Sequence, residues 1–242
     1  MPAPPLSVLK EATLFLDLDG TLLELVDQPD AVRADAGLHV LLTELRHKLD
    51  GRLAIISGRS LQQIDEILGE CAADLAISGS HGCEHRWNGL LARPNRPPTL
   101  DEAAARLRLF AQDQPGVFVE EKSFGVALHY RMAPNKEAEA QLLADALSNA
   151  LGLQLQQGKM MVELRVAGGD KGLALQRLMN RAPMKGTAPV FAGDDVTDEA
   201  GFAAARKLGG HAILIGSPRA TSADFNLPSP GALRDWLWAA MP

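Results

Sequence analysis

Short apolar runs alternate with helical segments in the first and last thirds of this 242-residue chain, and that alternation limits the possible folds most strongly. Residues 13–18 and 53–57 have the length and composition of buried strands. Between these runs, leucines recur with the spacing of one helix face: Leu38, Leu41, Leu42, Leu45 and Leu49. We therefore expect an α/β fold whose Rossmann-like, three-layer core has a mainly parallel sheet covered by helices on both faces.

Further strand and helix signals extend this pattern. Ser60 and Gln63 have the spacing of a capping box, which predicts that a helix begins at Ser60. The other elements expected in the core are strands at 75–78, 190–192 and 212–215, a helix at about 197–208, and a last helix that carries Trp236 and Leu237.

The middle of the chain follows a different order, helix–strand–strand, which occurs twice. A helix after the proline-rich stretch 93–100 is expected to be capped by Thr99 and Glu102. The other elements expected here are a helix at about 135–151 and strands at 116–121, 124–130, 153–156 and 160–166. This order predicts an α+β domain, residues 88–168, inserted into a core formed by residues 1–87 and 169–242.

Charge and composition argue against several classes of function. The net charge is −6 without a dense block of lysines and arginines, so we expect neither nucleic acid nor a membrane surface as a partner. The apolar runs are far shorter than the roughly 20 residues that span a bilayer, and the first residues lack the pattern of a signal peptide. Cys71 and Cys83 lack a metal-binding spacing and are interpreted as two free thiols, which fits the cytoplasm. In the absence of a long heptad pattern, a monomer is the default expectation.

Two aspartates stand where the first strand is expected to end. Asp17 and Asp19 belong to the sequence Asp-Leu-Asp-Gly-Thr at residues 17–21. In open α/β sheets ligands bind at the carboxyl ends of the strands, so both carboxylates are expected to face a crevice. One can supply an attacking oxygen and the other a proton, and both are oxygen ligands suited to Mg²⁺. An isolated pair of this kind is more typical of a solvated turn.

A second acidic group follows the strand expected at 190–192. Four acids fall within residues 194–199: Asp194, Asp195, Asp198 and Glu199. Carboxylates this close repel one another unless a cation or hydrogen bonds compensate, and beside Asp17 they would form a divalent-metal site. For Glu199 we favour the simpler role of complementing the dipole of the helix that begins here.

Two further segments are candidates for binding a phosphate. Ser57, Gly58 and Arg59 end the second strand and offer a hydroxyl, a backbone N–H and a cation at the start of a helix. Lys171 falls in the first turn of another expected helix, where a cation normally weakens the favourable dipole. Its position is explained if a phosphate or an aspartate cluster lies opposite; a lone lysine is otherwise a solvated surface charge.

These four groups, in this order, resemble the motifs of the haloacid-dehalogenase superfamily: 17–21, Ser57, Lys171 and 193–198. The insertion between the second and third motifs is similar to the larger cap of the sugar-phosphatase branch. Within that branch the chain resembles the trehalose-6-phosphate phosphatases, in the stretches 80–86, 119–122, 128–131, 158–165 and 168–172. Cys83 departs from the alanine that is more frequent in that family.

The resemblance implies a Mg²⁺-dependent phosphatase that hydrolyses trehalose 6-phosphate through an aspartyl-phosphate. Asp17 would be the nucleophile, and Asp19 the general acid and base. Mg²⁺ would be held by the Asp17 carboxylate, the Asp19 backbone carbonyl and Asp194. Asp195 and Asp198 would orient water, metal or Lys171. The phosphoryl group would be bound by Ser57, Gly58, Arg59 and Lys171.

The cap would then recognise a hydroxyl-rich disaccharide with charged and polar side chains. The candidates are Glu121, Lys122, His129, Arg131, Lys159 and Glu163. Charged residues that alternate along a strand usually form a solvated face instead, and His129 is compatible with a structural role. His81 would contact the substrate or serve a turn. The alternatives that stay open are a phosphatase of another sugar phosphate, such as sucrose phosphate, mannosyl-phosphoglycerate or a hexose phosphate, and a non-catalytic sugar-phosphate sensor.

Overall fold

A computed structural model describes residues 1–25, 33–158, 160–166 and 169–241 of the chain. These residues divide into two compact units. The core unit is Met1–Arg93 with Gly169–Pro242, and the inserted unit is Pro94–Gly168.

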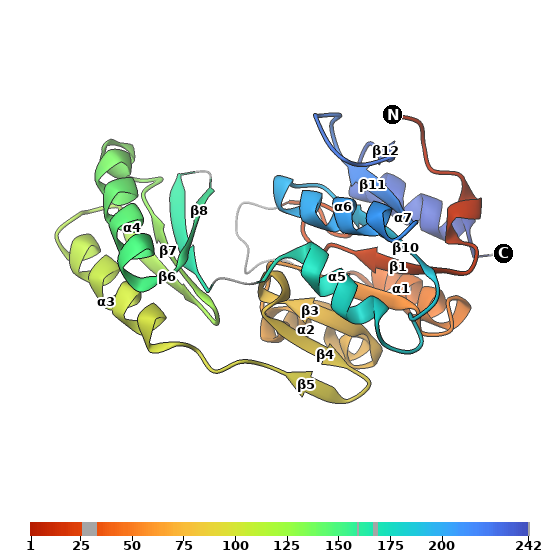
Figure 1. Ribbon diagram of the computed structural model, residues 1–242. Helices are drawn as coiled ribbons and strands as arrows, with labels where there is room; N and C mark the ends of the chain where they lie inside the picture. Colours follow the sequence, from red (N-terminus) through yellow and green to blue (C-terminus); the bar gives the residue numbers. More distant parts are fainter. Residues whose placement is uncertain (26–32, 159, 167–168, 242) are drawn as a thin grey trace. The chain divides into compact units, whose positions relative to one another are not determined.

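The core unit is built on an eight-stranded sheet with the order β12-β11-β10-β1-β2-β3-β4-β5 (Figure 1). The strands from β12 to β3 are parallel, and the hairpin of β4 and β5 adds two antiparallel strands. Their bounds are β1 Ala12–Leu16, β2 Leu53–Ile56, β3 Ala76–Gly79, β4 Glu84–Trp87, β5 Leu90–Ala92, β10 Ala188–Gly193, β11 His211–Ile215 and β12 Phe225–Leu227.

Helices cover both faces of this sheet. They are α1 Ala36–Lys48, α2 Leu61–Leu68, α5 Lys171–Met179, α6 Glu199–Lys207 and α7 Pro230–Ala239, with short 3-10 helices at Leu6–Leu9, Gly69–Asp74, Ser80–Gly82 and Val196–Asp198. Side chains of β1 alternate between the faces: Leu14 and Leu16 pack with α1, α2 and α7, whereas Phe15 packs with α5 and α6. The expected α/β fold with a three-layer core is therefore confirmed.

The helix signals read from the sequence have clear counterparts. Four of the five leucines assigned to one face of the first helix lie inside α1 and are buried, and Leu49 follows directly as its buried C-cap. Ser60 caps α2, and its side chain and that of Gln63 form both hydrogen bonds of a capping box. Thr99, in contrast, does not cap the next helix. That helix begins at Pro98, two residues before the start that a Thr99 cap would give, because proline has no N–H to satisfy and its φ suits the first helical position.

The first domain boundary lies at residue 94 rather than at the expected residue 88. Residues 90–92 form β5, which pairs with β4 and so extends the core sheet. β4 is mostly polar and β5 is a three-residue apolar segment that lies exposed, and the sequence analysis assigned no strand to either of them.

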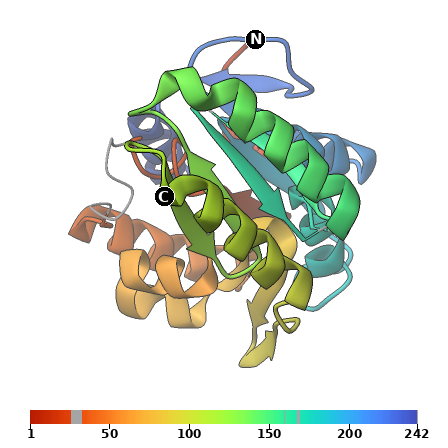
Figure 2. The same cartoon turned by 90° about the vertical axis from the view of Figure 1, so that its left-hand side faces the viewer.

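The inserted unit contains a four-stranded antiparallel sheet with the order β6-β7-β9-β8. Its elements are α3 Pro98–Gln112, β6 Phe118–Lys122, β7 Gly125–His129, α4 Glu137–Leu151, β8 Gln154–Gly158 and β9 Met161–Arg165, with a 3-10 turn at Pro134–Lys136. Both helices lie on one face of the sheet (Figure 2). Val126, Leu128, Val162 and Leu164 pack against them, so the residues that alternate with these four lie on the opposite face, which we call the open face.

Candidate active site

The four sequence groups converge at the carboxyl ends of three neighbouring strands. Asp17 follows β1, Ser57 follows β2 and Asp194 follows β10, and β1 lies between the other two strands. The backbone N–H of Asp17 donates to the carbonyl of Ala192 at the end of β10 (3.0 Å), which fixes the two strand ends against each other. The edge of the sheet that the sequence pattern indicated therefore holds the polar residues.

A buried chain of charges links Asp17 to α5 and to the loop after β10. Lys171 Nζ lies 2.7 Å from Asp17 Oδ1 and 2.6 Å from Asp198 Oδ1. All three side chains are nearly inaccessible to solvent, at 4%, 3% and 0% exposure of Asp17, Lys171 and Asp198. Burial raises the pKa of Asp17 well above its ordinary value, although the Lys171 ammonium opposes this. Burial disfavours the ammonium, but attraction to Asp17 and Asp198 outweighs it and keeps the pKa of Lys171 above its ordinary value.

Both carboxylate oxygens of Asp198 accept hydrogen bonds. Its Oδ1 accepts from Lys171, and its Oδ2 accepts from the backbone N–H groups of Asp194 and Asp195, both at 3.0 Å. Asp198 therefore orients Lys171, one of the roles expected for it. Asp195 is exposed, and its Oδ1 accepts from the backbone N–H of Val196 (2.6 Å), so its side chain caps the 3-10 turn Val196–Asp198.

The Asp194 carboxylate rests on the turn that follows β1. A Cβ atom at Gly20 would lie 2.1 Å from Asp194 Oδ2, so only glycine leaves room for this contact. Thr21 Oγ1 donates to Asp194 Oδ1 (3.2 Å) and lies 3.5 Å from Asp17 Oδ2. Thr21 was part of the first motif, but its own role at the site was not predicted. Burial, together with the neighbouring Asp198, raises the pKa of Asp194 to about 6.

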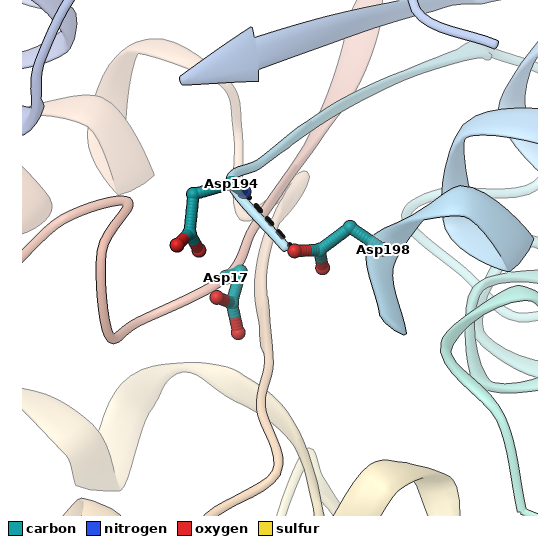
Figure 3. Close-up of side chains that lie close together, drawn as sticks. All are labelled: Asp17, Asp194 and Asp198. Carbon is teal, nitrogen blue, oxygen red and sulfur yellow. Dashed lines mark hydrogen bonds between the residues drawn. The ribbon is translucent and has the colours of Figure 1, made fainter. Parts of the chain in front are cut away.

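Asp17, Asp194 and Asp198 converge closely enough to hold a metal ion, with one oxygen of each within 4.8 Å of the others (Figure 3). When all are ionised, three carboxylates face a single ammonium, which leaves an excess of two negative charges in a largely buried site. A divalent cation bound by oxygen atoms neutralises that excess. Asp198 is fully buried and accepts three hydrogen bonds, so Asp17 and Asp194 have more oxygen capacity left for an ion.

Asp19 and the segment after β2 form the second half of the site. The Arg59 guanidinium donates from Nε to Asp19 Oδ2 (2.6 Å) and from Nη2 to Asp19 Oδ1 (2.7 Å). Ser57 is buried, and its Oγ accepts from the Arg59 backbone N–H (3.2 Å), which leaves its O–H to donate. The residues 57–59 thus lie beside Asp19, as expected for one phosphate site.

The turn after β3 supports this segment. Ser80 N donates to Arg59 O (2.7 Å), and His81 N donates to Ser57 O (3.0 Å). The His81 ring packs against Gly58, where a Cβ atom would lie 2.6 Å from Nε2. Glu84 Oε1 accepts from Leu61 N (3.0 Å) at the start of α2 and from Ser80 Oγ (2.7 Å). The structure therefore gives His81 a place in the turn, which was one of its two expected roles.

A protein-family model described as trehalose-phosphatase matches residues 15–230 of the chain. The chain belongs to the trehalose-phosphatase family. The resemblance to haloacid-dehalogenase-type trehalose-6-phosphate phosphatases that the four motifs indicated is thereby confirmed, and with it the class of enzyme.

Relatives in the trehalose-phosphatase family cover most of the chain. The trehalose-6-phosphate phosphatase of Escherichia coli is 38% identical over 230 residues, which are 94% of this chain and 85% of that protein. The trehalose-phosphate phosphatase of Mycobacterium tuberculosis is 33% identical over 247 residues, covering 95% of this chain and 61% of the longer relative.

Solved structures show the same fold. A structure described as a trehalose-6-phosphate phosphatase related protein has a TM-score of 0.76 at 29% identity, with 94% of this chain and 96% of that chain covered. The C-terminal domain of the Candida albicans trehalose-6-phosphate phosphatase has a TM-score of 0.80 at 22% identity, covering 99% and 97%. At that identity the likeness concerns the fold alone.

In this trehalose-phosphatase, several of the predicted cap residues lie together on the open face of the inserted unit. Lys122 Nζ donates to Glu163 Oε2 (2.7 Å). The Glu163 carboxylate lies over Gly125, where a Cβ atom would be 2.5 Å from Oε1. On the same face His129 Nε2 lies 2.8 Å from Glu120 Oε2, and the His129 ring stacks on Phe118 with 4.5 Å between ring centroids.

Of the predicted residues that the structure describes, Glu121 and Arg131 fall outside this group. Glu121 faces the helices of the inserted unit, where it forms ion pairs with Arg96 and Arg108. It is therefore not brought together with Lys122 and Glu163, because neighbouring residues of a strand point to opposite faces. Arg131 is exposed in the loop after β7, and Lys159 lies outside the described residues.

Glu120 is a polar residue of the open face that the sequence analysis missed. Val119 packs against the helices, so period-two alternation along β6 places Glu120 rather than Glu121 beside Lys122 on the open face. That apolar neighbour was the available signal. Within the described part of the chain, no helix combines the length and apolar character needed to cross a bilayer.

Proposed function

We propose that the chain hydrolyses trehalose 6-phosphate to trehalose and phosphate, with Asp17 as the nucleophile. The observation that supports this most strongly is the buried arrangement of Asp17, Lys171 and Asp198 beside Asp194. It gives one carboxylate a fixed position next to a cation, at the strand ends where an α/β sheet binds its ligand. The family supplies the choice of sugar phosphate.

The reaction takes place in two displacements. An Asp17 carboxylate oxygen attacks phosphorus, and the bond from phosphorus to the sugar oxygen breaks, which gives an aspartyl-phosphate. Asp19 donates a proton to the leaving sugar oxygen. Water then attacks the aspartyl-phosphate, Asp19 takes up its proton, and the bond to Asp17 breaks to release phosphate and restore both side chains.

The transferring phosphoryl group is held by Lys171 and Ser57. Two of the three N–H groups of Lys171 are accounted for by Asp17 and Asp198, so the third can donate to a phosphoryl oxygen. The Ser57 hydroxyl is available for the same purpose. Donors fixed before the reaction stabilise the charge on the phosphoryl oxygens of the transition state without further reorganisation.

Mg²⁺ is the divalent ion that we assign to the site. Asp17, Asp194 and the backbone carbonyl of Asp19 would hold it, since it prefers oxygen ligands in near-octahedral geometry. When bound, it neutralises phosphoryl charge and helps to position the phosphate for in-line attack. Asp198 supports the site by holding Lys171 and the Asp194 backbone.

The open face of the inserted unit is proposed to bind the sugar. Glu120, Lys122 and His129 offer donors and acceptors on one surface, and hydroxyl groups can use both; the buried Glu163 holds Lys122 in place. These side chains are paired with one another in the structure. A bound sugar would therefore break some of these hydrogen bonds, and its hydroxyls would take the place of the lost partners.

The assignment is tested by kcat/KM with Mg²⁺ on a panel of sugar phosphates: trehalose 6-phosphate, sucrose phosphate, mannosyl-phosphoglycerate and glucose 6-phosphate. We expect trehalose 6-phosphate to be preferred by at least about tenfold, which corresponds to about 1.4 kcal/mol, the scale of one lost hydrogen bond to a sugar hydroxyl. A different preferred substrate overturns the sugar assignment but keeps the chemistry. Binding without any turnover favours a sensor.

The nucleophile is tested separately by Asp17→Asn. Its kcat should fall by at least about a thousandfold, the scale seen when a nucleophile is removed. Asp65→Asn is the control, because Asp65 pairs with Arg86 in the core unit, away from Asp17 and its partners. Unchanged phosphate release by Asp17→Asn excludes Asp17 as the nucleophile.

A further inference from the structure

The backbone segment of Asp194 and Asp195 is bound by opposite charges. Its two N–H groups donate to the Asp198 carboxylate at 3.0 Å each. Its two carbonyl groups accept from Arg219 Nη2, with 2.7 Å to Asp195 O and 3.5 Å to Asp194 O. An anion therefore holds the donors of this segment and a cation holds its acceptors, and both contacts are charge-assisted.

Arg219 is itself fixed by Glu199. Its Nη1 group pairs with Glu199 Oε1 and donates to the carbonyl of Ala220 (3.0 Å), while Glu199 Oε2 accepts from Ser222 N (2.8 Å). Burial alone would raise the pKa of Glu199, but hydrogen bonds from the Ser222 N–H, Thr221 and Arg219 hold it below its ordinary value. Glu199 thus has a specific partner, beyond the helix-dipole role favoured from the sequence.

Steric contacts also restrict the backbone segment of Asp194 and Asp195. A Cβ atom at Gly193 would lie 2.3 Å from Asp198 Cγ, so the chain reaches Asp194 through a position that only glycine fits. The Asp194 carboxylate is then directed by Gly20 and Thr21 on one side and by its own backbone on the other. Loss of the Arg219 contact would leave two carbonyl groups without this restraint and allow the backbone at Asp194 to rotate.

We propose that Arg219, held by Glu199, is a positioning residue that fixes the Asp194 carboxylate in the orientation needed to bind the divalent cation. The inference rests on the proposed function, since it assigns Asp194 to that cation. Groups that orient a metal ligand typically change metal affinity by about 10- to 100-fold when removed. An ordinary partly exposed ion pair would instead contribute little to stability and nothing to metal binding.

The test compares Arg219→Met with Arg206→Met. Arg206 also pairs with a carboxylate, Asp224 (3.0 Å), and donates to a backbone carbonyl, Ser222 O (3.1 Å), but has no recorded contact with the metal-site segment among the described residues. Isothermal titration with Mg²⁺ alone gives the affinity without turnover. We expect Mg²⁺ to bind about tenfold more weakly to Arg219→Met, and Arg206→Met to stay within about twofold of the unmodified protein.

Two conservative variants separate positioning from charge. Arg219→Lys keeps the positive charge but loses the planar fork that reaches three carbonyls and a carboxylate together, so it should also weaken Mg²⁺ binding. Glu199→Gln should give a smaller loss, about threefold, because Arg219 keeps its backbone contacts. In the phosphatase assay, the Mg²⁺ concentration for half-maximal rate should rise in Arg219→Met more than kcat at saturating Mg²⁺ falls.

Unchanged Mg²⁺ affinity in folded Arg219→Met overturns the inference, and so does an equal loss in Arg206→Met. If Arg219→Met does not fold, Glu199→Gln decides: an affinity equal to that of the unmodified protein contradicts the role of the pair. If the unmodified protein binds Mg²⁺ but leaves trehalose 6-phosphate intact, the substrate proposal fails while the titrations still decide the role of Arg219.

Discussion

Arg59 holds both carboxylate oxygens of Asp19, with Nε–Oδ2 at 2.6 Å and Nη2–Oδ1 at 2.7 Å. The proton transfers proposed for Asp19 need a defined direction toward the sugar oxygen and the attacking water, and a planar guanidinium fixes the plane of a carboxylate better than a single ammonium does. The geometry therefore makes Arg59 the residue that orients Asp19.

Replacement of Arg59 by lysine should lower kcat/KM for trehalose 6-phosphate by about 10- to 100-fold, because misplacement of a reacting group by about 1 Å has that effect. Arg86→Lys is the matched control. Arg86 also donates two hydrogen bonds to one aspartate, Asp65 (2.8 and 2.6 Å), and should lose stability without losing kcat. Steady-state kinetics and thermal unfolding measure the two effects. Equal kcat/KM in Arg59→Lys would contradict the orienting role.

The site could be located from the sequence because its parts are contiguous motifs at strand ends. The identities of Asp17, Ser57, Lys171 and Asp194 predict the chemistry, and the rule that parallel strands present their carboxyl ends to a ligand brings the motifs together. The strands themselves are buried on both faces, so they appear in the sequence as short, nearly continuous apolar runs that can be recognised.

What could not be predicted depends on long-range contacts. Arg219 lies 24 residues beyond Asp195 in the chain. Its hydrogen bonds go to backbone carbonyl groups, which every residue has, so no pattern of side chains indicates them. The choice between Glu120 and Glu121, in contrast, could have been made from strand alternation, because the apolar Val119 marks the helix-covered face that Glu121 shares. The hairpin of β4 and β5 lacks a buried apolar run altogether.

The raised pKa of Asp194 leads to a prediction of how metal binding depends on pH. Its pKa is raised to about 6 in the folded chain, above its ordinary value of 3.8. In the metal-free protein the folded state therefore holds its proton more tightly than the unfolded state does, and this group costs stability as pH rises from about 4 to about 6. Mg²⁺ needs the ionised carboxylate, so its affinity should fall as pH drops below about 6.

Thermal unfolding with and without Mg²⁺ measures both parts of this prediction. The rise in Tm caused by Mg²⁺ should be large at pH 7.5 and small at pH 5. Asp194→Asn should have a higher Tm than the unmodified protein when both are metal-free at pH 7.5, because one of three crowded carboxylates is gone. It should also lose the response to Mg²⁺. A Mg²⁺ response that is the same at both pH values would argue against Asp194 as a ligand.

The candidate phosphate-binding segment, residues 57–59, is expected to depend on Glu84, a buried acid outside it. Glu84→Ala leaves the N–H of Leu61 and the hydroxyl of Ser80 without their acceptor. A buried donor that loses its partner costs about 1–3 kcal/mol, which corresponds to a fall in Tm of about 2–4 °C per kcal/mol for a chain of this size.

The same change should raise the KM for trehalose 6-phosphate, since Arg59 and Ser57 are held by the turn that Glu84 supports. The exposed Glu66 of α2 gives the control: Glu66→Ala should leave Tm within about 1 °C, as surface substitutions do. Calorimetry and steady-state kinetics provide the readouts. A stable Glu84→Ala protein with unchanged KM would remove the link between this turn and the site.

Glu163 and Glu121 offer a direct test of which face of the inserted sheet binds the sugar. Glu163 lies on the open face and accepts from Lys122, whereas Glu121 faces the helices and pairs with Arg96 and Arg108. Glu163→Gln keeps the size of the side chain but removes its charge and weakens its hold on Lys122, which we propose to bind sugar hydroxyls. We expect its KM for trehalose 6-phosphate to rise about tenfold, the scale of one lost charge-assisted hydrogen bond.

Para-nitrophenyl phosphate separates sugar recognition from phosphate chemistry, because it has no sugar hydroxyls. Glu163→Gln should leave its hydrolysis unchanged within about twofold, and Glu121→Gln should leave both substrates unchanged on the same scale, since a partly exposed ion pair is worth less than about 1 kcal/mol. If Glu121→Gln raised the KM for trehalose 6-phosphate and Glu163→Gln did not, the sugar would bind on the helix-covered side, and strand alternation would be the wrong guide to specificity in this sheet.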